Sequence, residues 1–197
     1  MEHTKLPLTT WHATHCLSGN VQMDDAYLGG ERVGGKTGRG SEDKVPFVAV
    51  GSTNAKVHPM YLKLHLLSGF TSEAIGKWAK ANLTHGTKII SDGLTCFAAV
   101  VDAGCMHEPR VVGGLQLCDL PEFKGVNTVL CNIKTTLAEV FCELKYGKYS
   151  QRYLAAFAYR FNRRFDLRAL VARLIVDLVR TTPFNEMVVR AQTKTAF

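Results

Sequence analysis

The stretch VQMDDAYL at residues 21–28 decides the fold, because it places two acidic residues inside a β-forming segment. Its β-forming ends, followed by Gly29 and Gly30, predict a strand. An unpaired carboxylate inside an apolar strand is costly, so Asp24 is the informative residue. Side chains alternate along a strand, and we therefore expect Asp25 to point to the opposite face. Only one of the two would then face a given site.

Two further strands follow a glycine-rich loop. Residues 29–44 (GGERVGGKTGRGSEDK) hold six glycines and four basic residues, which predicts a loop. Residues 44–52 (KVPFVAVGS) predict a second strand, and residues 60–67 (MYLKLHLL) alternate in the way that is typical of a third. We expect these three strands to be antiparallel.

Helices and strands alternate in the rest of the chain. A helix begins at Thr71 or Ser72, and a short buried strand at residues 88–91 (KIIS) ends at Asp92 and Gly93. The later segments are a helix at 95–103, a short strand at 110–114, helical sequence from Val126 onward and an amphipathic helix from Leu167 to Leu178. This order predicts an α/β fold, namely a ribonuclease H-like mixed sheet flanked by helices.

Composition indicates one globular domain and a polyanionic partner. With 197 residues, 46% of them hydrophobic and 21% charged, the chain is neither disordered, collagen-like nor a coiled coil. It has no apolar run of about 20 residues and no signal-peptide core, so we expect a soluble, cytoplasmic protein without a membrane partner. The net charge of +7 favours nucleic acid as partner. Seven basic residues lie between residues 145 and 168, opposed by Asp166 alone.

The six cysteines do not have the spacing of a zinc site. No CxxC pair is present, and we expect free thiols that are mostly buried. The tightest group is Cys105 and His107, with Cys96 and Cys118 on either side. Paired spacing is missing, which disfavours a structural zinc site at this group, but the sequence leaves a metal role for Cys105 and His107 open.

Two acidic residues have positions suited to metal-dependent chemistry. Asp92 follows a buried strand directly, where α/β sheets usually carry ligand groups. Carboxylates on neighbouring strands can hold Mg²⁺ and support phosphoryl transfer. In the alternative interpretation, Asp24 pairs with an arginine and Asp92 only forms a turn with Gly93. Spacing alone leaves both interpretations open.

Four segments together resemble a known family. They are VQMDDAYLGGERVGGKTGRG, ISDGLTCFAAVVDAGCMHEP, LPEFKGVNTVLCNIK and KYSQRYLAAFAYRFNRRFDL. They are similar to the ISXO2-like transposase domain of small bacterial insertion sequences, which belongs to the DDE superfamily with retroviral integrases. The resemblance runs from about Val21 to Pro183. It implies a retroviral integrase-type fold and metal-dependent DNA strand cleavage at transposon ends, followed by transfer of the freed 3′-hydroxyl to target DNA.

The resemblance also implies a set of site residues. Its catalytic positions fall on Asp24, Asp92 and Asn127, in the subgroup whose third catalytic residue is Asn, with Lys134 seven residues further on. The same three residues would ligate Mg²⁺ or Mn²⁺, and the neutral amide would hold the metal more loosely than a third carboxylate. Asn132 is a rival for the third position, and a helix N-cap is an alternative role for Asn127.

DNA contacts follow from the same resemblance. Lys134 would reach a phosphate, and four arginines would hold the DNA backbone, namely Arg152, Arg160, Arg163 and Arg164. Their alternative role is a solvated helix face. The implied partners are transposon ends and target DNA in the bacterial cytoplasm and nucleoid, with the protein as a homo-oligomer on DNA.

The chain departs from the family in three places. Only eleven residues separate Trp11 from Met23, too few for the helix-turn-helix that follows a zinc ribbon in complete relatives. Gly125 stands where relatives usually have an aromatic residue, and residues 139–142 (EVFC) replace a Gly-Thr-Tyr-His run. We therefore expect a remnant N-terminal segment (1–20), a catalytic domain (21–183) and a C-terminal tail (184–197). We also expect weak activity, and the alternative is an inactive remnant that binds DNA or dimerises with an intact transposase.

Overall fold

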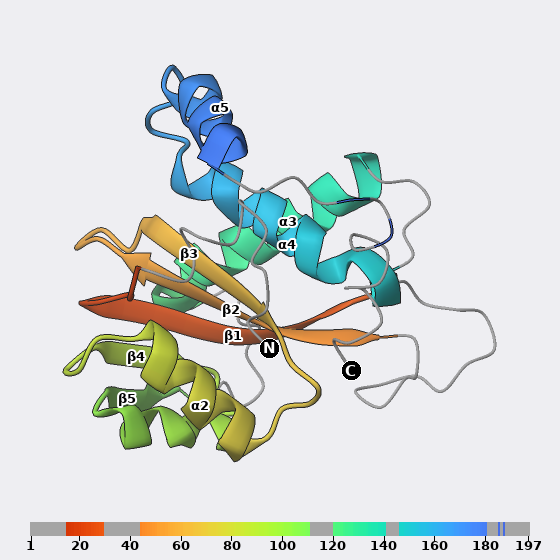
Figure 1. Ribbon diagram of the computed structural model, residues 1–197. Helices are drawn as coiled ribbons and strands as arrows, with labels where there is room; N and C mark the ends of the chain where they lie inside the picture. The colour runs from red at the N-terminus through yellow and green to blue at the C-terminus, as the bar shows by residue number, and fades with distance from the viewer. Residues whose placement is uncertain are drawn as a thin grey trace.

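A five-stranded mixed sheet forms the centre of the protein (Figure 1). The computed structural model describes residues 15–29, 44–110, 120–140 and 146–180, together with residues 185 and 187. The strands lie in the order β3-β2-β1-β4-β5. Their bounds are β1 (Asn20–Leu28), β2 (Val45–Thr53), β3 (Pro59–Leu66), β4 (Lys88–Ser91) and β5 (Met106–Pro109). This order, with flanking helices, is the predicted ribonuclease H-like arrangement.

The first three strands form an antiparallel meander, and the last two are parallel to β1. β1 pairs with β2 along its whole length, from Asn20 opposite Thr53 to Leu28 opposite Val45. On its other side β1 pairs with β4 only as far as Met23, which lies opposite Ser91. The carboxyl end of β4 therefore lies beside the middle of β1, where the two acidic residues follow.

Helical segments cover both faces of the sheet (Figure 1). One face packs on α2 (Ser72–Asn82) and the 3-10 helix η1 (Thr95–Ala103), and the other on α3 (Lys124–Val140) and α4 (Tyr146–Asn162). The short 3-10 helix η3 (Pro121–Phe123) leads into α3. Alternation along β1 builds both cores, because its odd-numbered apolar residues face α2 and its even-numbered ones face α3.

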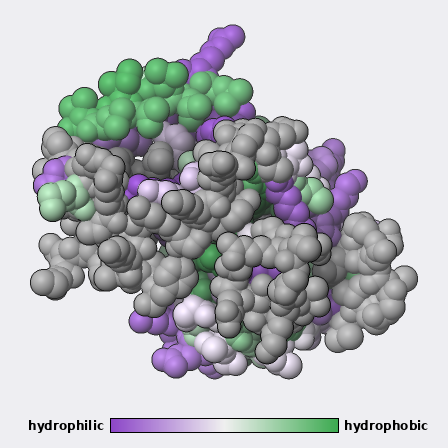
Figure 2. Space-filling view, turned by 90° about the vertical axis from the view of Figure 1, so that its right-hand side faces the viewer, coloured by the Kyte–Doolittle hydropathy of each residue, from purple (hydrophilic) through white to green (hydrophobic). Residues whose placement is uncertain are grey.

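The last described helix, α5 (Leu170–Arg180), extends away from the sheet (Figure 1). Within the described part of the chain, no residue of α5 is buried. Figure 2 shows a hydrophobic band at the top of the molecule, where α5 lies. Its exposed apolar residues include Val171, Leu174, Ile175, Leu178 and Val179. Among the described helices, none has the length and apolarity needed to cross a membrane.

Most of the predicted elements are confirmed, and one strand lies elsewhere. α2 begins as expected, with the Thr71 hydroxyl accepting a hydrogen bond from the Ala74 N–H at 3.2 Å. The sequence predicts a short strand at 110–114, but Arg110 is not part of a strand. The strand that pairs with β4 is β5, which ends at Pro109. β5 has little apolar content and is held by backbone pairing, so hydrophobic periodicity does not reveal it. Residues 111–114 and 30–43 lie outside the described residues.

The folded part of the chain includes residues ahead of β1. Leu17 is 2% exposed and forms a parallel bridge with Leu83 at the end of α2. Its N–H donates to the Asn82 carbonyl oxygen at 2.8 Å. This part of the predicted N-terminal segment, 1–20, thus belongs to the core.

Candidate active site

Three carboxylates gather where β4 ends beside β1. Asp24 and Asp25 lie on β1, and Asp92 follows β4 directly. One oxygen from each lies within 4.8 Å of the others. The parallel pairing of β1 and β4 brings Asp24 and Asp92 together, as the strand pattern predicts.

The expectation that only one of Asp24 and Asp25 faces the site is wrong, because both reach the cluster. The reason lies in the length of β4, which stops opposite Met23. Beyond that point no described strand pairs with this edge of β1, so short side chains from both faces can bend around the edge toward Asp92. The Asp25 N–H donates to Asp24 Oδ1 at 2.9 Å, which keeps the Asp24 carboxylate close to the backbone.

A tight turn positions Asp92. Its Oδ1 accepts a hydrogen bond from the Leu94 N–H at 3.1 Å, and Gly93 adopts a φ of 87°, which favours glycine. The Ser91 hydroxyl lies 2.9 Å from His107 Nε2 on β5. The turn and the ligand role of Asp92 are compatible, since a carboxylate accepts several partners.

Neither an arginine partner for Asp24 nor a metal role for the cysteines is supported in the described part of the chain. Asp24 has no arginine partner there, and Lys134 is the cation whose charge acts on it. Cys105 Sγ donates to the Thr84 carbonyl oxygen. Within the described residues, the side chains close enough together to hold a metal ion are the three carboxylates, not the cysteines. Cys118 lies outside the described residues.

The burial of Asp24 beside two other carboxylates raises its pKa from 3.8 to about 7. Burial is the largest cause, and the charges of Asp92 and Asp25 add to it. The Asp25 N–H and the Lys134 ammonium act in the opposite direction. A partly buried group of oxygen ligands that repel one another fits a hard divalent cation, which would offset that repulsion.

Asn127 lies in the first turn of α3 with an unused donor. Its Nδ2 is buried and has no hydrogen-bond partner among the described residues. The N-cap role considered for Asn127 is wrong, because α3 already begins at Lys124. Asn127 and Lys134 are seven residues apart and so share one side of the helix. The Lys134 charge lowers the pKa of Asp24, although it is the smallest of the effects on that group. That this side of α3 faces the acidic cluster stays a prediction.

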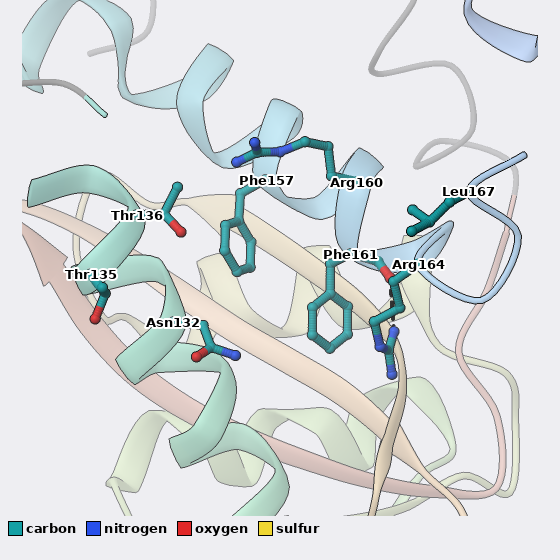
Figure 3. Close-up of a pocket in the computed structure, with 8 residues that line it drawn as sticks. All are labelled: Asn132, Thr135, Thr136, Phe157, Arg160, Phe161, Arg164 and Leu167. Atoms are coloured by element: carbon teal, nitrogen blue, oxygen red, sulfur yellow. Dashed lines mark hydrogen bonds between the residues drawn. The ribbon is translucent and has the colours of Figure 1, made fainter. Parts of the chain in front are cut away.

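The rival Asn132 lies on another side of α3. Five residues advance a helix by about 1.4 turns, which turns Asn132 away from Asn127. It is exposed and lines a groove of about 460 Å³ between α3 and α4 (Figure 3). The other lining residues are Thr135, Thr136, Phe157, Arg160, Phe161, Arg164 and Leu167. This geometry favours Asn127 over Asn132 beside the carboxylates.

Two of the four arginines predicted to contact DNA have partners inside the protein. Arg163 is 9% exposed, and its guanidinium lies 3.7 Å from the centre of the Tyr159 ring. The Arg164 guanidinium lies 3.9 Å from the centre of the Phe161 ring. It also donates to the Phe161 carbonyl oxygen of α4 (Figure 3). Two further carbonyls that accept from it belong to Met60 and Pro59 of β3. These contacts favour a structural role for Arg163 and Arg164 over the predicted contact with DNA.

The other two arginines are better placed to meet a ligand. Arg160 is exposed, and Figure 3 shows its side chain extending along the groove between α3 and α4. Arg152 is half-buried, with its guanidinium 5.6 Å from the centre of the Tyr149 ring.

Sequence reasoning missed Asp25 and Gln22. Gln22 is buried two residues before Asp24, and its amide binds Val126 in the first turn of α3 and Glu122 in η3 just before it. A signal was present, because a polar residue two positions from Asp24 shares its strand face.

The comparison with protein families agrees with this geometry. A family profile described as the ISXO2-like transposase domain matches residues 16–162, which include the whole sheet, the acidic cluster and α3. No curated protein matches the chain. On the extent of the profile match, the chain belongs to the family of ISXO2-like transposase domains.

Proposed function

We propose that this domain catalyses metal-dependent DNA strand cleavage and strand transfer for an insertion sequence. The observation that carries the proposal is the approach of Asp24, Asp25 and Asp92 to within 4.8 Å in a chain of this family. A pair of carboxylates so close together, one of them buried, is unfavourable without a cation. Phosphoryl transfer uses such a cation to activate the nucleophile and to stabilise the leaving oxygen.

The proposed metal ligands are Asp24, Asp92 and Asn127, with Mg²⁺ or Mn²⁺ as the cation. Asp25 is a fourth candidate, since its carboxylate belongs to the same cluster. In cleavage, an oxygen nucleophile attacks the phosphorus and the bond to the 3′-oxygen breaks. In strand transfer, that 3′-hydroxyl loses its proton and attacks a phosphorus of the target strand, and the bond from that phosphorus to the target's own 3′-oxygen breaks. The effect of the Lys134 charge on the pKa of Asp24 supports a role for its ammonium group in binding a phosphate oxygen of the DNA.

DNA is the proposed partner, and its backbone is the part that the protein would contact outside the cluster. The net charge of +7 and the exposed Arg160 support this role. Such contacts are independent of sequence and weaken with salt, because each neutralised phosphate releases counterions. Assembly of the protein into a homo-oligomer on DNA stays a prediction.

The test is cleavage of supercoiled plasmid and joining of pre-nicked transposon-end DNA in Mg²⁺ or Mn²⁺. We expect metal-dependent products from the wild type and their loss in Asp24→Ala and Asp92→Ala. Asp102→Ala is a matched control, because Asp102 is an exposed acid on η1 outside the cluster. Products that persist in both cluster variants contradict the proposal. Binding of DNA without any product, in the wild type and in either metal, instead supports the inactive remnant.

A further inference from the structure

The buried side chain of Gln22 joins the strand of the acidic residues to the helix of Asn127. Gln22 is 2% exposed. Its Oε1 accepts a hydrogen bond from the Val126 N–H at 2.8 Å, and its Nε2 donates to the Glu122 carbonyl oxygen. The N–H groups of a first helical turn have no partner within the helix, so Gln22 supplies one from β1. One amide thus fixes both the approach to α3 and its first turn.

This link lies next to both kinds of candidate ligand. Gln22 and Asp24 are two residues apart on β1 and so leave the strand on the same face. Asn127 follows Val126 directly on α3. The hydrogen bond between Gln22 and Val126 therefore fixes the position of Asn127 relative to Asp24 through very few rotatable bonds.

The close approach of the Gln22 amide to the first turn of α3 requires glycine at position 125. A Cβ there would lie 2.6 Å from Gln22 Oε1 and 3.1 Å from the Val57 carbonyl oxygen. Real Cβ atoms do not approach so closely, and the Gln22 amide is the group that would have to move. Gly125 and Gln22 thus form a pair, in which the missing side chain makes room for the amide.

We propose that Gln22 is a positioning residue, which holds Asn127 where it can share a divalent cation with Asp24 and Asp92. This inference rests on the proposed function, because it gives Gln22 a part in that same site. Apolar contacts also attach α3 to the sheet, through residues such as Phe123 and Val129. These contacts are non-directional, whereas the two hydrogen bonds of Gln22 fix the rotation of the first turn.

The chain contains a matched control for a purely structural role. Asn162, at the end of α4, holds Leu62 of β3 through its own amide, which donates to the Leu62 carbonyl oxygen at 2.8 Å and accepts from its N–H at 2.7 Å. This second amide also joins a helix to the sheet, but it belongs to neither the acidic cluster nor α3. Loss of either amide leaves two backbone groups without a partner, so both variants should lose stability by similar amounts.

The test is Mn²⁺ binding by the metal-free protein, measured by electron paramagnetic resonance. We compare wild type with Gln22→Met and Asn162→Leu, which keep side-chain volume but remove the hydrogen bonds. We expect Gln22→Met to weaken Mn²⁺ binding on the order of tenfold, as does loss of a group that orients a metal ligand. Asn162→Leu should leave the affinity within about twofold of wild type, as is usual for independent sites.

Two further variants show whether Gln22 acts through Asn127. Gln22→Met combined with Asn127→Ala should bind Mn²⁺ no more weakly than Asn127→Ala alone, because the effects share one cause. Gly125→Ala retains Gln22 but displaces its amide, and it should weaken binding in the same way. This variant tests the inference even where Gln22→Met fails to fold.

Three results would overturn the inference. They are equal Mn²⁺ affinities in Gln22→Met and Asn162→Leu, additive losses in the double variant, and wild-type affinity in Gly125→Ala. Each leaves the proposed function standing if Asp24→Ala and Asp92→Ala still abolish binding. If those two variants bind Mn²⁺ like the wild type, the proposed function itself fails, and the inference fails with it.

Discussion

The carboxylates of Asp24 and Asp92 lie within 4.8 Å of each other, although Asp24 is a buried residue of β1 and Asp92 follows the end of β4. The arrangement is unfavourable for the fold without a cation, because burial and two neighbouring negative charges all oppose the ionised form of Asp24. The three carboxylates thus repel one another, and a bound metal ion would offset this repulsion. Stability, metal binding and pH should therefore be linked at this site.

Asp24→Asn should stabilise the metal-free protein at neutral and higher pH. The folded-state pKa of Asp24, about 7, lies above the ordinary value of 3.8, so the folded state binds the proton more tightly. The resulting stability is fully present below the unfolded pKa and is lost as the pH rises through the folded one. The charged form then costs on the order of 4 kcal/mol, which the neutral amide avoids.

Urea unfolding without divalent cations checks this expectation. Asp24→Asn should have the larger free energy of unfolding at about pH 8, and the difference should shrink steadily as the pH falls and vanish only below the unfolded pKa of 3.8, where Asp24 is protonated in both states. Asp102→Asn, outside the cluster, should change little at either pH. A destabilised Asp24→Asn at the higher pH would show that the Asp24 charge is well compensated without a metal.

Mn²⁺ affinity should depend on pH through the same carboxyl group. A proton on Asp24 competes with the metal, so affinity should fall by up to about tenfold per pH unit below the pKa of about 7 and level off above it. Calorimetric titration at several pH values on both sides of neutrality measures this slope. An affinity that does not change across that range would mean that Asp24 is not a ligand.

Substitutions at Arg160 and Arg164 should have different effects, one on DNA binding and the other on stability, although the two residues are only four positions apart. Arg160→Ala should reduce the salt dependence of DNA binding by about one phosphate contact and leave the melting temperature unchanged. Arg164→Ala removes donors from several backbone carbonyls and should cost about 2–3 kcal/mol of stability. Fluorescence anisotropy with duplex DNA at several salt concentrations, beside thermal unfolding, measures both. Equal effects of the two variants on both quantities would contradict this division.

Gly125→Ala should destabilise the protein, and removal of the Gln22 side chain should reduce the cost. The added methyl group would press on Gln22 Oε1 from 2.6 Å, which we expect to cost about 1–3 kcal/mol. In a Gln22→Ala background the nearest obstacle is gone, although the Val57 carbonyl oxygen at 3.1 Å remains. Urea unfolding of both single variants and the double variant gives the coupling energy. Additive costs would show that the two positions do not interact.

The parts of the fold that depend on local patterns could be predicted from sequence. Alternation and β-forming residues predict β1, β2 and β3 within one residue at each end, and a buried apolar run predicts β4 with its end just before Asp92. β5 has too few apolar residues to be found in this way, and it owes its place to backbone pairing with β4. A strand can be predicted when its own side chains show a pattern. A strand that is held only by backbone pairing with its neighbour leaves no such pattern in the sequence.

The candidate site divides in the same way. The approach of Asp24 and Asp92 follows from a strand pattern, but the inclusion of Asp25 depends on how far β4 extends along β1. The sequence predicts the four arginines on one helix, but α4 ends at Asn162, before Arg163 and Arg164. The packing of this end of α4 on β3 engages Arg164 within the protein. Gln22 acts across a long separation in sequence, so spacing could mark it as polar and buried but could not name its partners.

The most direct test of the metal site is anomalous scattering from a crystal of the protein grown with Mn²⁺. We predict an anomalous peak within coordination distance of Asp24 and Asp92, with the side-chain oxygen of Asn127 turned toward it. The peak should vanish in Asp24→Ala crystals and remain in Asp102→Ala crystals. A cluster without a peak at saturating Mn²⁺, or a peak only at exposed acids such as Glu108, would contradict a catalytic metal site at this place in the fold.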